Sequence, residues 1–320
     1  MEKKLLVFIG LMAIVPFALG QTKDFPNRPI KFIAPFAPGS GADTSGRFFG
    51  GELAKVIGQP VVIDNRPGAS GAVGALAVKN APADGYTVLV SGWSAQSVNP
   101  IVIKDLPYDP IKDLKPISGL NRTALGFFVP VNSKLNTLAD LVNTAKNSRQ
   151  SLNVGNISAG QQLVLAWFAG LAGVKFMIVP YKSGGQMLTD LVGNQIDWAV
   201  ENVPSAGALV KAGKLRALAV GSENRHHEFP NVPTFKESGY PEFVSYGWSA
   251  LYVRSETPDD VTTVLAEAMQ KALATNASKE YARKRGAELM QFGPAAMRKY
   301  EADELARFRR IAAAAGIKPK

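Results

Sequence analysis

Short apolar runs alternate with longer stretches of helical periodicity along most of the chain. The first set predicts strands at 30–35, 61–64 and 86–91, with helices at 42–57 and 71–80 between them. Gly58 marks the end of the first helix, and Asp84-Gly85 marks a turn before the third strand. This βαβαβ order predicts a mostly parallel sheet covered by helices.

A second α/β set begins near residue 135. Thr137 and Asp140 have the spacing of a capping box, which predicts a helix running to residue 146. The pattern then predicts strands at 152–155, 176–180, 196–201 and 215–220, and helices at 161–170, 186–193 and 206–212. Extended segments at 126–130 and 246–253 flank this set.

The order of elements predicts an α/β fold of two lobes, each a mostly parallel sheet flanked by helices. We expect two crossover connections and a hinge, as in binding proteins that close a cleft on a ligand. The expected boundaries are 1–20 for a leader, 21–125 plus 249–320 for the first lobe and 126–248 for the second. A helical tail from Pro258, with Thr257 as its N-cap, should return to the first lobe.

The N-terminus predicts export by a secretory signal peptide. Lys3 and Lys4 precede an apolar run at 5–19, and Ala18-Leu19-Gly20 offers small residues at the spacing that signal peptidase recognises. A membrane span needs about 20 apolar residues, so a signal peptide is favoured over an uncleaved anchor. Cleavage is expected near Gly20-Gln21, which would leave a soluble mature protein.

Composition narrows the chemistry further. The chain is 46% hydrophobic, has no cysteine and has only two histidines. The high apolar content excludes a disordered chain, and the lack of cysteine excludes disulfides, a thiolate nucleophile and any metal site with cysteine ligands. The adjacent His226 and His227 should lie on a solvated loop beside Arg225 and Glu228. We therefore expect no catalysis, no cofactor and no metal.

The net charge of +10 lies mostly in the tail. Residues 271–320 hold twelve basic and five acidic side chains, including the clusters 283–285 and 307–310. We interpret these clusters as a solvated face and not as the binding site. A basic protein that binds nucleic acid or lipid is an alternative, and it would show strong salt dependence. Export disfavours nucleic acid as the partner.

Two loops that join a strand to a helix could hold an anion. In segment 35–44, Gly39 and Gly41 would let the backbone approach a ligand, and the amides of a helix N-terminus attract anions. The alternative is a tight turn in which Asp43 or Thr44 caps the helix. In segment 155–161, Ser158 could either cap the next helix or donate to a ligand. Facing N-termini, one from each lobe, would clamp a carboxylate.

Trp93 and Trp248 lie beside small polar residues, where each could stack on a planar ligand or simply pack. A different alternative is an exported α/β hydrolase with Ser94 as nucleophile. Its surroundings, Gly92-Trp-Ser-Ala-Gln96, lack the second glycine of a nucleophile elbow.

Several strings of residues carry a family resemblance. They are FPNRPI (25–30), PFAPGSGAD (35–43), DNRPGASG (64–71), ADGYT (83–87), LADL (138–141), VPYKSG (179–184), GKLRALA (213–219) and NVPT (231–234). With these strings, essentially the whole mature chain resembles the solute-binding receptors of tripartite tricarboxylate transporters, the TctC or Bug family.

The resemblance implies a periplasmic, type II-like Venus-flytrap fold. It also implies a carboxylate held by backbone amides and ordered water from the first loop of each lobe, and transient contact of a monomeric receptor with integral-membrane permease subunits. The chain departs from the family at Asn156–Gln162, where a Gly-Ser/Thr-rich stretch followed by His is usual, and at Trp93, where a small residue is usual. Both departures argue against a standard small aliphatic ligand, and Trp93 with Phe36 favours an aromatic ring. The ligand we expect is an aromatic carboxylate or a dicarboxylate.

The loops and the resemblance together define the predicted ligand-binding residues. They are Phe36, Ala37, Pro38, Gly39, Ser40, Gly41, Asp43, Thr44, Trp93, Ser94, Ser158, Ala159, Gly160, Gln161, Tyr181, Ser183, Gly184, Glu201 and Asn202.

Overall fold

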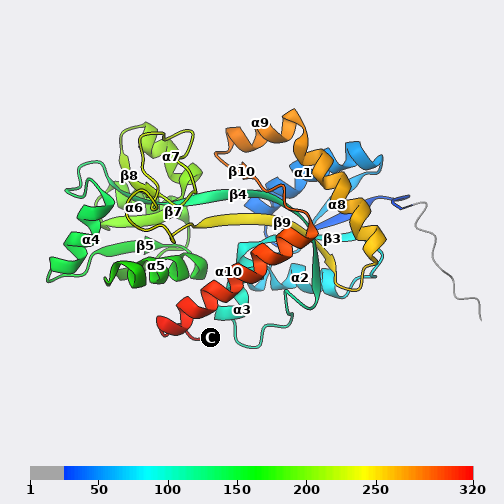
Figure 1. Cartoon of the computed structure of the whole chain (residues 1–320), viewed down its shortest axis with the longest axis horizontal. Helices are drawn as coiled ribbons and strands as arrows, with labels where there is room; N and C mark the ends of the chain where they lie inside the picture. Colours follow the sequence, from blue (N-terminus) through cyan, green and yellow to red (C-terminus); the bar gives the residue numbers. More distant parts are fainter. Residues whose placement is uncertain (1–24, 320) are drawn as a thin grey trace, which may run out of the picture.

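The computed structural model describes residues 25–319, so the predicted signal peptide lies outside the described residues. Figure 1 shows an elongated molecule in which two lobes lie side by side, joined by two long strands. The strands are β1 (Ile30–Ala34), β2 (Val61–Asn65), β3 (Thr87–Gly92), β4 (Leu114–Pro130), β5 (Asn153–Asn156), β6 (Met177–Pro180), β7 (Trp198–Asn202), β8 (Leu215–Val220), β9 (Tyr246–Arg254) and β10 (Glu288–Leu289).

Helices cover the sheet of each lobe. The helices and short helical turns are α1 (Gly41–Ile57), η2 (Ala69–Gly71), α2 (Ala72–Lys79), η3 (Ser94–Val98), α3 (Asn99–Val102), α4 (Leu138–Asn147), α5 (Ala159–Ala172), α6 (Gly184–Val192), α7 (Val203–Lys211), α8 (Asp259–Ala274), α9 (Asn276–Lys284) and α10 (Pro294–Ala314). Within residues 25–319, no helix is both long enough and apolar enough to cross a membrane.

The first lobe is built on β1, which pairs in parallel with β2 on one side and β3 on the other. Its apolar core joins strand residues such as Phe32 and Val88 to Phe49 of α1 and Met269 of α8, all of them fully buried. In the second lobe, β5 pairs in parallel with β6 and β7. There the core is an aromatic cluster around Phe127, which contacts Phe168, Trp198, Phe235 and Phe243.

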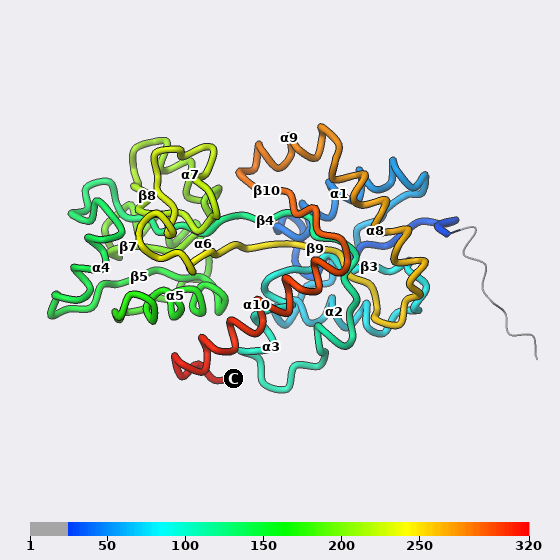
Figure 2. The backbone as a smooth tube through the Cα atoms, in the orientation of Figure 1, coloured from blue at the N-terminus to red at the C-terminus, as the bar shows by residue number. Residues whose placement is uncertain are grey.

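β4 and β9 connect the lobes and pair with each other in antiparallel fashion. Figure 2 follows the chain out of the first lobe along β4, through the second lobe and back along β9. β4 begins at Leu114, well before the predicted extended segment at 126–130. Its register shifts between Pro116 and Ser118 and again between Gly119 and Asn121. Such bulges interrupt the alternation of inward and outward side chains that identifies a strand in a sequence.

The N-cap of α8, the first helix of the tail, differs from the prediction. Pro258, not Thr257, is the N-cap residue of α8, and the Thr257 hydroxyl bonds to no other group among residues 25–319. α8 packs on α1, whereas α10 contacts β4, η3 and α5. Leu305 and Phe308 of α10 join the apolar core of the second lobe. α10 thus reaches from one lobe to the other, and the exact lobe boundaries given above stay a prediction.

Candidate functional site

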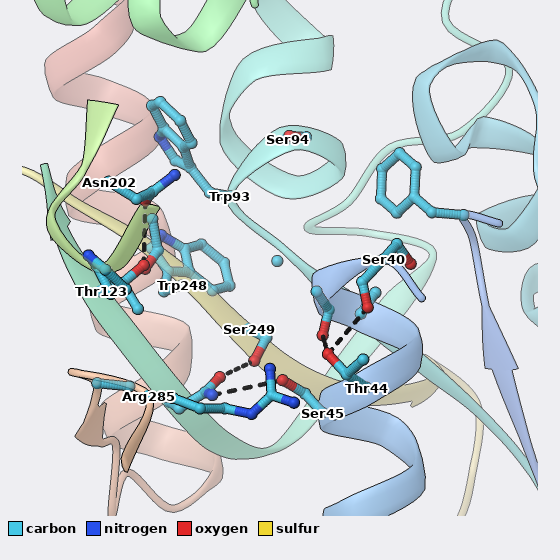
Figure 3. A pocket seen from close by; sticks show the side chains of 18 of the residues that line it. Ser40, Thr44, Ser45, Trp93, Ser94, Thr123, Asn202, Trp248, Ser249 and Arg285 are labelled. Atoms are coloured by element: carbon cyan, nitrogen blue, oxygen red, sulfur yellow. Dashed lines mark hydrogen bonds between the residues drawn. The ribbon is translucent and has the colours of Figure 1, made fainter. Parts of the chain in front are cut away.

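A pocket of about 520 Å³ lies where the two lobes meet, a size typical of small-molecule sites. Its walls come from the N-terminal half of α1, the end of β3 with η3, the middle of β4, the first half of β9, the start of α7, and the end of α9 with the turn after it (Figure 3). The lining residues are Phe36, Ser40, Gly41, Ala42, Thr44, Ser45, Ser91, Gly92, Trp93, Ser94, Ala95, Asn121, Thr123, Asn202, Pro204, Ser205, Gly247, Trp248, Ser249, Tyr281, Arg285 and Ala287.

The pocket contains seven of the residues predicted from sequence. They are Phe36, Ser40, Gly41, Thr44, Trp93, Ser94 and Asn202. The structure places twelve others outside its lining: Ala37, Pro38, Gly39, Asp43, Ser158, Ala159, Gly160, Gln161, Tyr181, Ser183, Gly184 and Glu201. Whether the predicted residues bind a ligand stays a prediction.

The N-terminus of α1 opens onto the pocket. Ser40 is the N-cap, and its hydroxyl accepts a hydrogen bond from the Asp43 amide at 3.3 Å, so neither Asp43 nor Thr44 fills that role. The amides of Gly41 and Ala42 have no hydrogen-bond partner among residues 25–319. Unpaired amides at a helix N-terminus carry partial positive charge and favour an anion.

Asp43 stabilises this loop through its hydrogen bonds and does not line the pocket. Its buried carboxylate accepts hydrogen bonds from the Gly39 amide and from Asn65 Nδ2, each at 2.9 Å, and pairs with Arg47 at 2.9 Å. The hydrogen bond from Arg47 is the main reason that the pKa of Asp43 is lowered to about 2. Asp43 therefore stays ionised and fixes the shape of the loop that begins α1.

The corresponding loop of the second lobe is closed off. Ser158 caps α5 by accepting from the Gln161 amide at 3.1 Å, and Gln161 Oε1 accepts from the Ile157 amide at 2.8 Å. The ring of Trp93 lies directly over Gly160, because a Cβ at that glycine would come within 2.7 Å of it. The α5 N-terminus is thereby separated from the pocket.

The predicted binding residues at the ends of β6 and β7 fall into two groups. Asn202 reaches the pocket, and its Oδ1 accepts a hydrogen bond from Thr123 of β4 at 3.1 Å. Glu201 instead points back into the second lobe, where its Oε1 accepts from the Asn202 amide at 2.7 Å. Burial raises the pKa of Glu201. Tyr181, Ser183 and Gly184 also lie outside the pocket lining, and Ser183 caps α6.

The pocket floor was not predicted from sequence. Asn121 Nδ2 donates to Ser45 Oγ at 3.4 Å, and Asn121 Oδ1 accepts from Ser249 Oγ. The Ser91 side chain is 2% exposed, lines the pocket and has no hydrogen-bond partner among residues 25–319. These residues lie inside strands and inside α1, and not in the loops that join strands to helices.

Arg285 corrects the interpretation of the basic tail. Residues 283–285 were predicted to form a solvated face apart from the binding site. All three are exposed, yet Arg285 also lines the pocket and points into it (Figure 3). It lies over the ring of Tyr281, with 4.8 Å between its Cζ and the ring centroid. It supplies the one charged side chain among the described residues that line the pocket.

Trp248 packs at the base of the pocket and is 6% exposed. Its Nε1 donates to Glu304 Oε2 at 2.6 Å, and Ser97 Oγ donates to the same oxygen at 2.7 Å. Burial raises the pKa of Glu304 to about 7. Trp248 is thus a packing residue with an anchored ring, which was one of the two interpretations left open for it.

His227 is exposed on a loop, as predicted, whereas His226 departs from the predicted solvated position. His226 is buried, its ring stacks on that of His227, and its Nε2 donates to the Gly286 carbonyl at 3.0 Å. Its Nδ1 accepts from the Glu228 amide at 3.3 Å, so both ring nitrogens are engaged and neither serves Ser94 as a base. Burial lowers the pKa of His226. Residues 25–319 contain no cluster of His, Asp and Glu suited to a metal.

Comparisons with known proteins agree with this architecture. Protein BugT of Bordetella pertussis is 33% identical over 322 residues, which cover 99% of each chain. Rpa4515 of R. palustris, solved with adipate, superposes with a TM-score of 0.80 at 30% identity over 93% of this chain and 100% of that one. MatC of Rhodopseudomonas palustris, solved with bound malate, superposes with a TM-score of 0.74 at 27% identity over 90% and 99%.

These matches confirm the predicted two-lobed fold of periplasmic binding proteins. Residues 46–317 match the tripartite tricarboxylate transporter family receptor profile, TctC. The family consists of binding receptors and is not a family of enzymes. The chain belongs to the TctC/Bug family of tripartite tricarboxylate transporter receptors.

Proposed function

We propose that this protein is a periplasmic receptor that binds a carboxylate between its lobes and delivers it to a tripartite tricarboxylate-type membrane transporter. The observation that carries the proposal is the charge of the pocket. Its described lining includes eight serine and threonine residues and one arginine, but no aspartate or glutamate. Donors without competing acidic groups favour an anion over a cation or a sugar.

The open end of α1 supports the same ligand class. The Gly41 and Ala42 amides and the Ser91 hydroxyl lie at the pocket without partners among residues 25–319, and a carboxylate oxygen could accept from each. Adipate and malate, the ligands solved with two structural relatives, are both dicarboxylates. An aromatic carboxylate is the second candidate, since Phe36, Trp93 and Trp248 line the pocket.

A thermal-shift screen of the purified mature protein tests the ligand class. Aliphatic dicarboxylates and aromatic carboxylates are compared with neutral sugars of similar size at one ionic strength. We expect the unfolding temperature to rise with at least one carboxylate, because a ligand that binds only the folded state stabilises it. A rise with sugars alone would contradict the proposal. Mass spectrometry of any compound released on denaturation would then identify the physiological ligand.

Export and delivery need their own test. We propose that the protein acts as a monomer in the periplasm and contacts permease subunits transiently. Osmotic-shock fractionation should release the processed chain with periplasmic markers. A chain that remained in the cytoplasm, or in the membrane at full length, would contradict this proposal.

A further inference from the structure

Three successive basic residues at the end of α9 have different partners. Arg283 pairs with Glu280 at 2.8 Å, and Lys284 approaches the same carboxylate at 3.5 Å. Arg285 forms no ion pair and no side-chain hydrogen bond with residues 25–319, and it is the member of the three that lines the pocket. An arginine beside an acid-free pocket is available to an anionic ligand.

Arg285 is oriented by packing. Tyr281 lies one helical turn earlier, and its ring stacks on that of Phe48 of α1 with 3.8 Å between centroids. The guanidinium lies over the ring of Tyr281, with 4.8 Å between Arg285 Cζ and the ring centroid. Stacking uses the face of the guanidinium and leaves the N–H donors in its plane free to bind a carboxylate.

The turn that follows Arg285 is fixed against the second lobe. The Gly286 carbonyl accepts a hydrogen bond from His226 Nε2 at 3.0 Å. A Cβ at Gly286 would lie 3.2 Å from both the His226 ring and Pro204, and Pro204 itself lines the pocket. Arg285 is therefore held at the junction of the lobes, where a bound ligand would lie.

The pocket consequently has two places that favour an anion. One is the start of α1, with the unpaired Gly41 and Ala42 amides. The other is Arg285, which shares its end of the pocket with Ser45. Ser45 lies four residues after Gly41, about one helical turn or 5–6 Å along the axis. Between them the pocket floor carries no charged side chain, and Asn121 uses both ends of its amide on Ser45 and Ser249.

We propose that Arg285 binds a second anionic group of the ligand, so that the pocket selects molecules with a carboxylate at each end over monocarboxylates of the same length. This inference rests on the proposed function, because it assumes that a carboxylate occupies the pocket. It assigns a ligand-selecting role to a residue outside the loops that begin α1 and α5.

Isothermal titration calorimetry with a chain-length series tests the inference. Each linear α,ω-dicarboxylate of four to eight carbons is paired with the monocarboxylate of equal length, such as adipate with hexanoate. The proteins are the wild type, Arg285→Gln and the control Lys284→Gln, which removes the same charge next to the pocket. We expect the best dicarboxylate to bind the wild type and the control at least about tenfold more tightly than its monocarboxylate, and Arg285→Gln to reduce that ratio below about threefold.

Monocarboxylate binding by Arg285→Gln shows in the same titrations that the variant is folded. If the preference for dicarboxylates is absent from the wild type, or persists in Arg285→Gln, the role of Arg285 is wrong while the carboxylate receptor stands. If no mono- or dicarboxylate binds the wild type, the carboxylate-receptor proposal and the inference are both overturned.

Discussion

The N-termini of α1 and α5 are built alike but meet different surroundings. Each follows a parallel strand, and each is capped by a serine that accepts from the amide three residues later, at 3.3 Å for Ser40 and 3.1 Å for Ser158. A Cβ at Gly41 would meet nothing within 4 Å, whereas one at Gly160 would meet the Trp93 ring at 2.7 Å. The same local motif yields one helix end that faces the pocket and one that is covered.

The Trp93 ring, which covers the N-terminus of α5, is held in place by α10. Trp93 immediately precedes η3, and Ser97 of η3 donates to Glu304 Oε2 at 2.7 Å. The Trp93 ring also lies 6.2 Å from that of Phe308, centroid to centroid. The difference between the two helix ends therefore depends on residues about two hundred positions away in the sequence, and it can be disturbed at several points.

The largest effect should come from the charge of Glu304. Burial raises its folded-state pKa from 4.5 to about 7, so the folded state binds this proton more tightly than the unfolded state does. Its contribution to stability is thus greatest below pH 4.5 and is lost as the pH rises to about 7. The loss over that interval should be about 3 kcal/mol, measured by urea unfolding across the pH range.

Glu304→Gln is the matched variant for this titration. Its amide oxygen can still accept from Trp248 and Ser97, but it carries no titrating proton. The fall attributable to Glu304 should disappear, while any fall caused by Glu301, whose pKa burial raises to about 8, should remain. Superimposable pH profiles of the two proteins would show that Glu304 does not titrate in this interval.

Trp93→Ala removes the cover itself. The ring is half-buried among Gly160, Phe308 and the core of both lobes, so its loss should lower the free energy of unfolding by about 2 kcal/mol. Trp93→Phe keeps an aromatic ring at this position and should lose clearly less. Equal stability of the two variants would contradict packing over α5 as the role of this ring.

The features that could be predicted from sequence depend on neighbouring residues. The Thr137–Asp140 capping box, the end of α1 at Gly58 and the alternation of strands and helices are all observed. Caps and periodicity arise from contacts within a few positions of the chain, which a sequence displays directly.

What could not be predicted depends on distant contacts. No local pattern distinguishes Arg285 from Arg283, because the difference is the placement of Tyr281 on Phe48 of α1. Asn121 and Ser249 lie on bulged, paired strands, so their meeting at the pocket floor follows from strand register. His226 looked solvated from its charged neighbours and is buried by the turn at Gly286.

Adding a methyl group at the start of α5 or of α1 tests the contact between Trp93 and α5 with a smaller change. In Gly160→Ala the new Cβ would overlap the Trp93 ring, which must move, at a cost of about 1.5 kcal/mol and with a shift in tryptophan emission. Gly41→Ala meets open space in a helical position, so its stability should be unchanged or higher by about 0.5 kcal/mol. Equal effects of the two methyl groups would mean that Trp93 does not rest on α5.

The smallest expected loss of stability separates capping from ligand binding. Ser40→Ala and Ser158→Ala each remove one N-cap hydrogen bond, so each should lower the free energy of unfolding by about 1 kcal/mol. Their effects on affinity should differ. Ser40 lines the pocket at the open end of α1, whereas Ser158 does not line it, so only Ser40→Ala should weaken binding of the carboxylate found by the thermal-shift screen. Because the two variants lose the same local contact, equal losses of affinity would mean that the ligand reaches both helix ends, and that the Trp93 cover over α5 opens when the ligand binds.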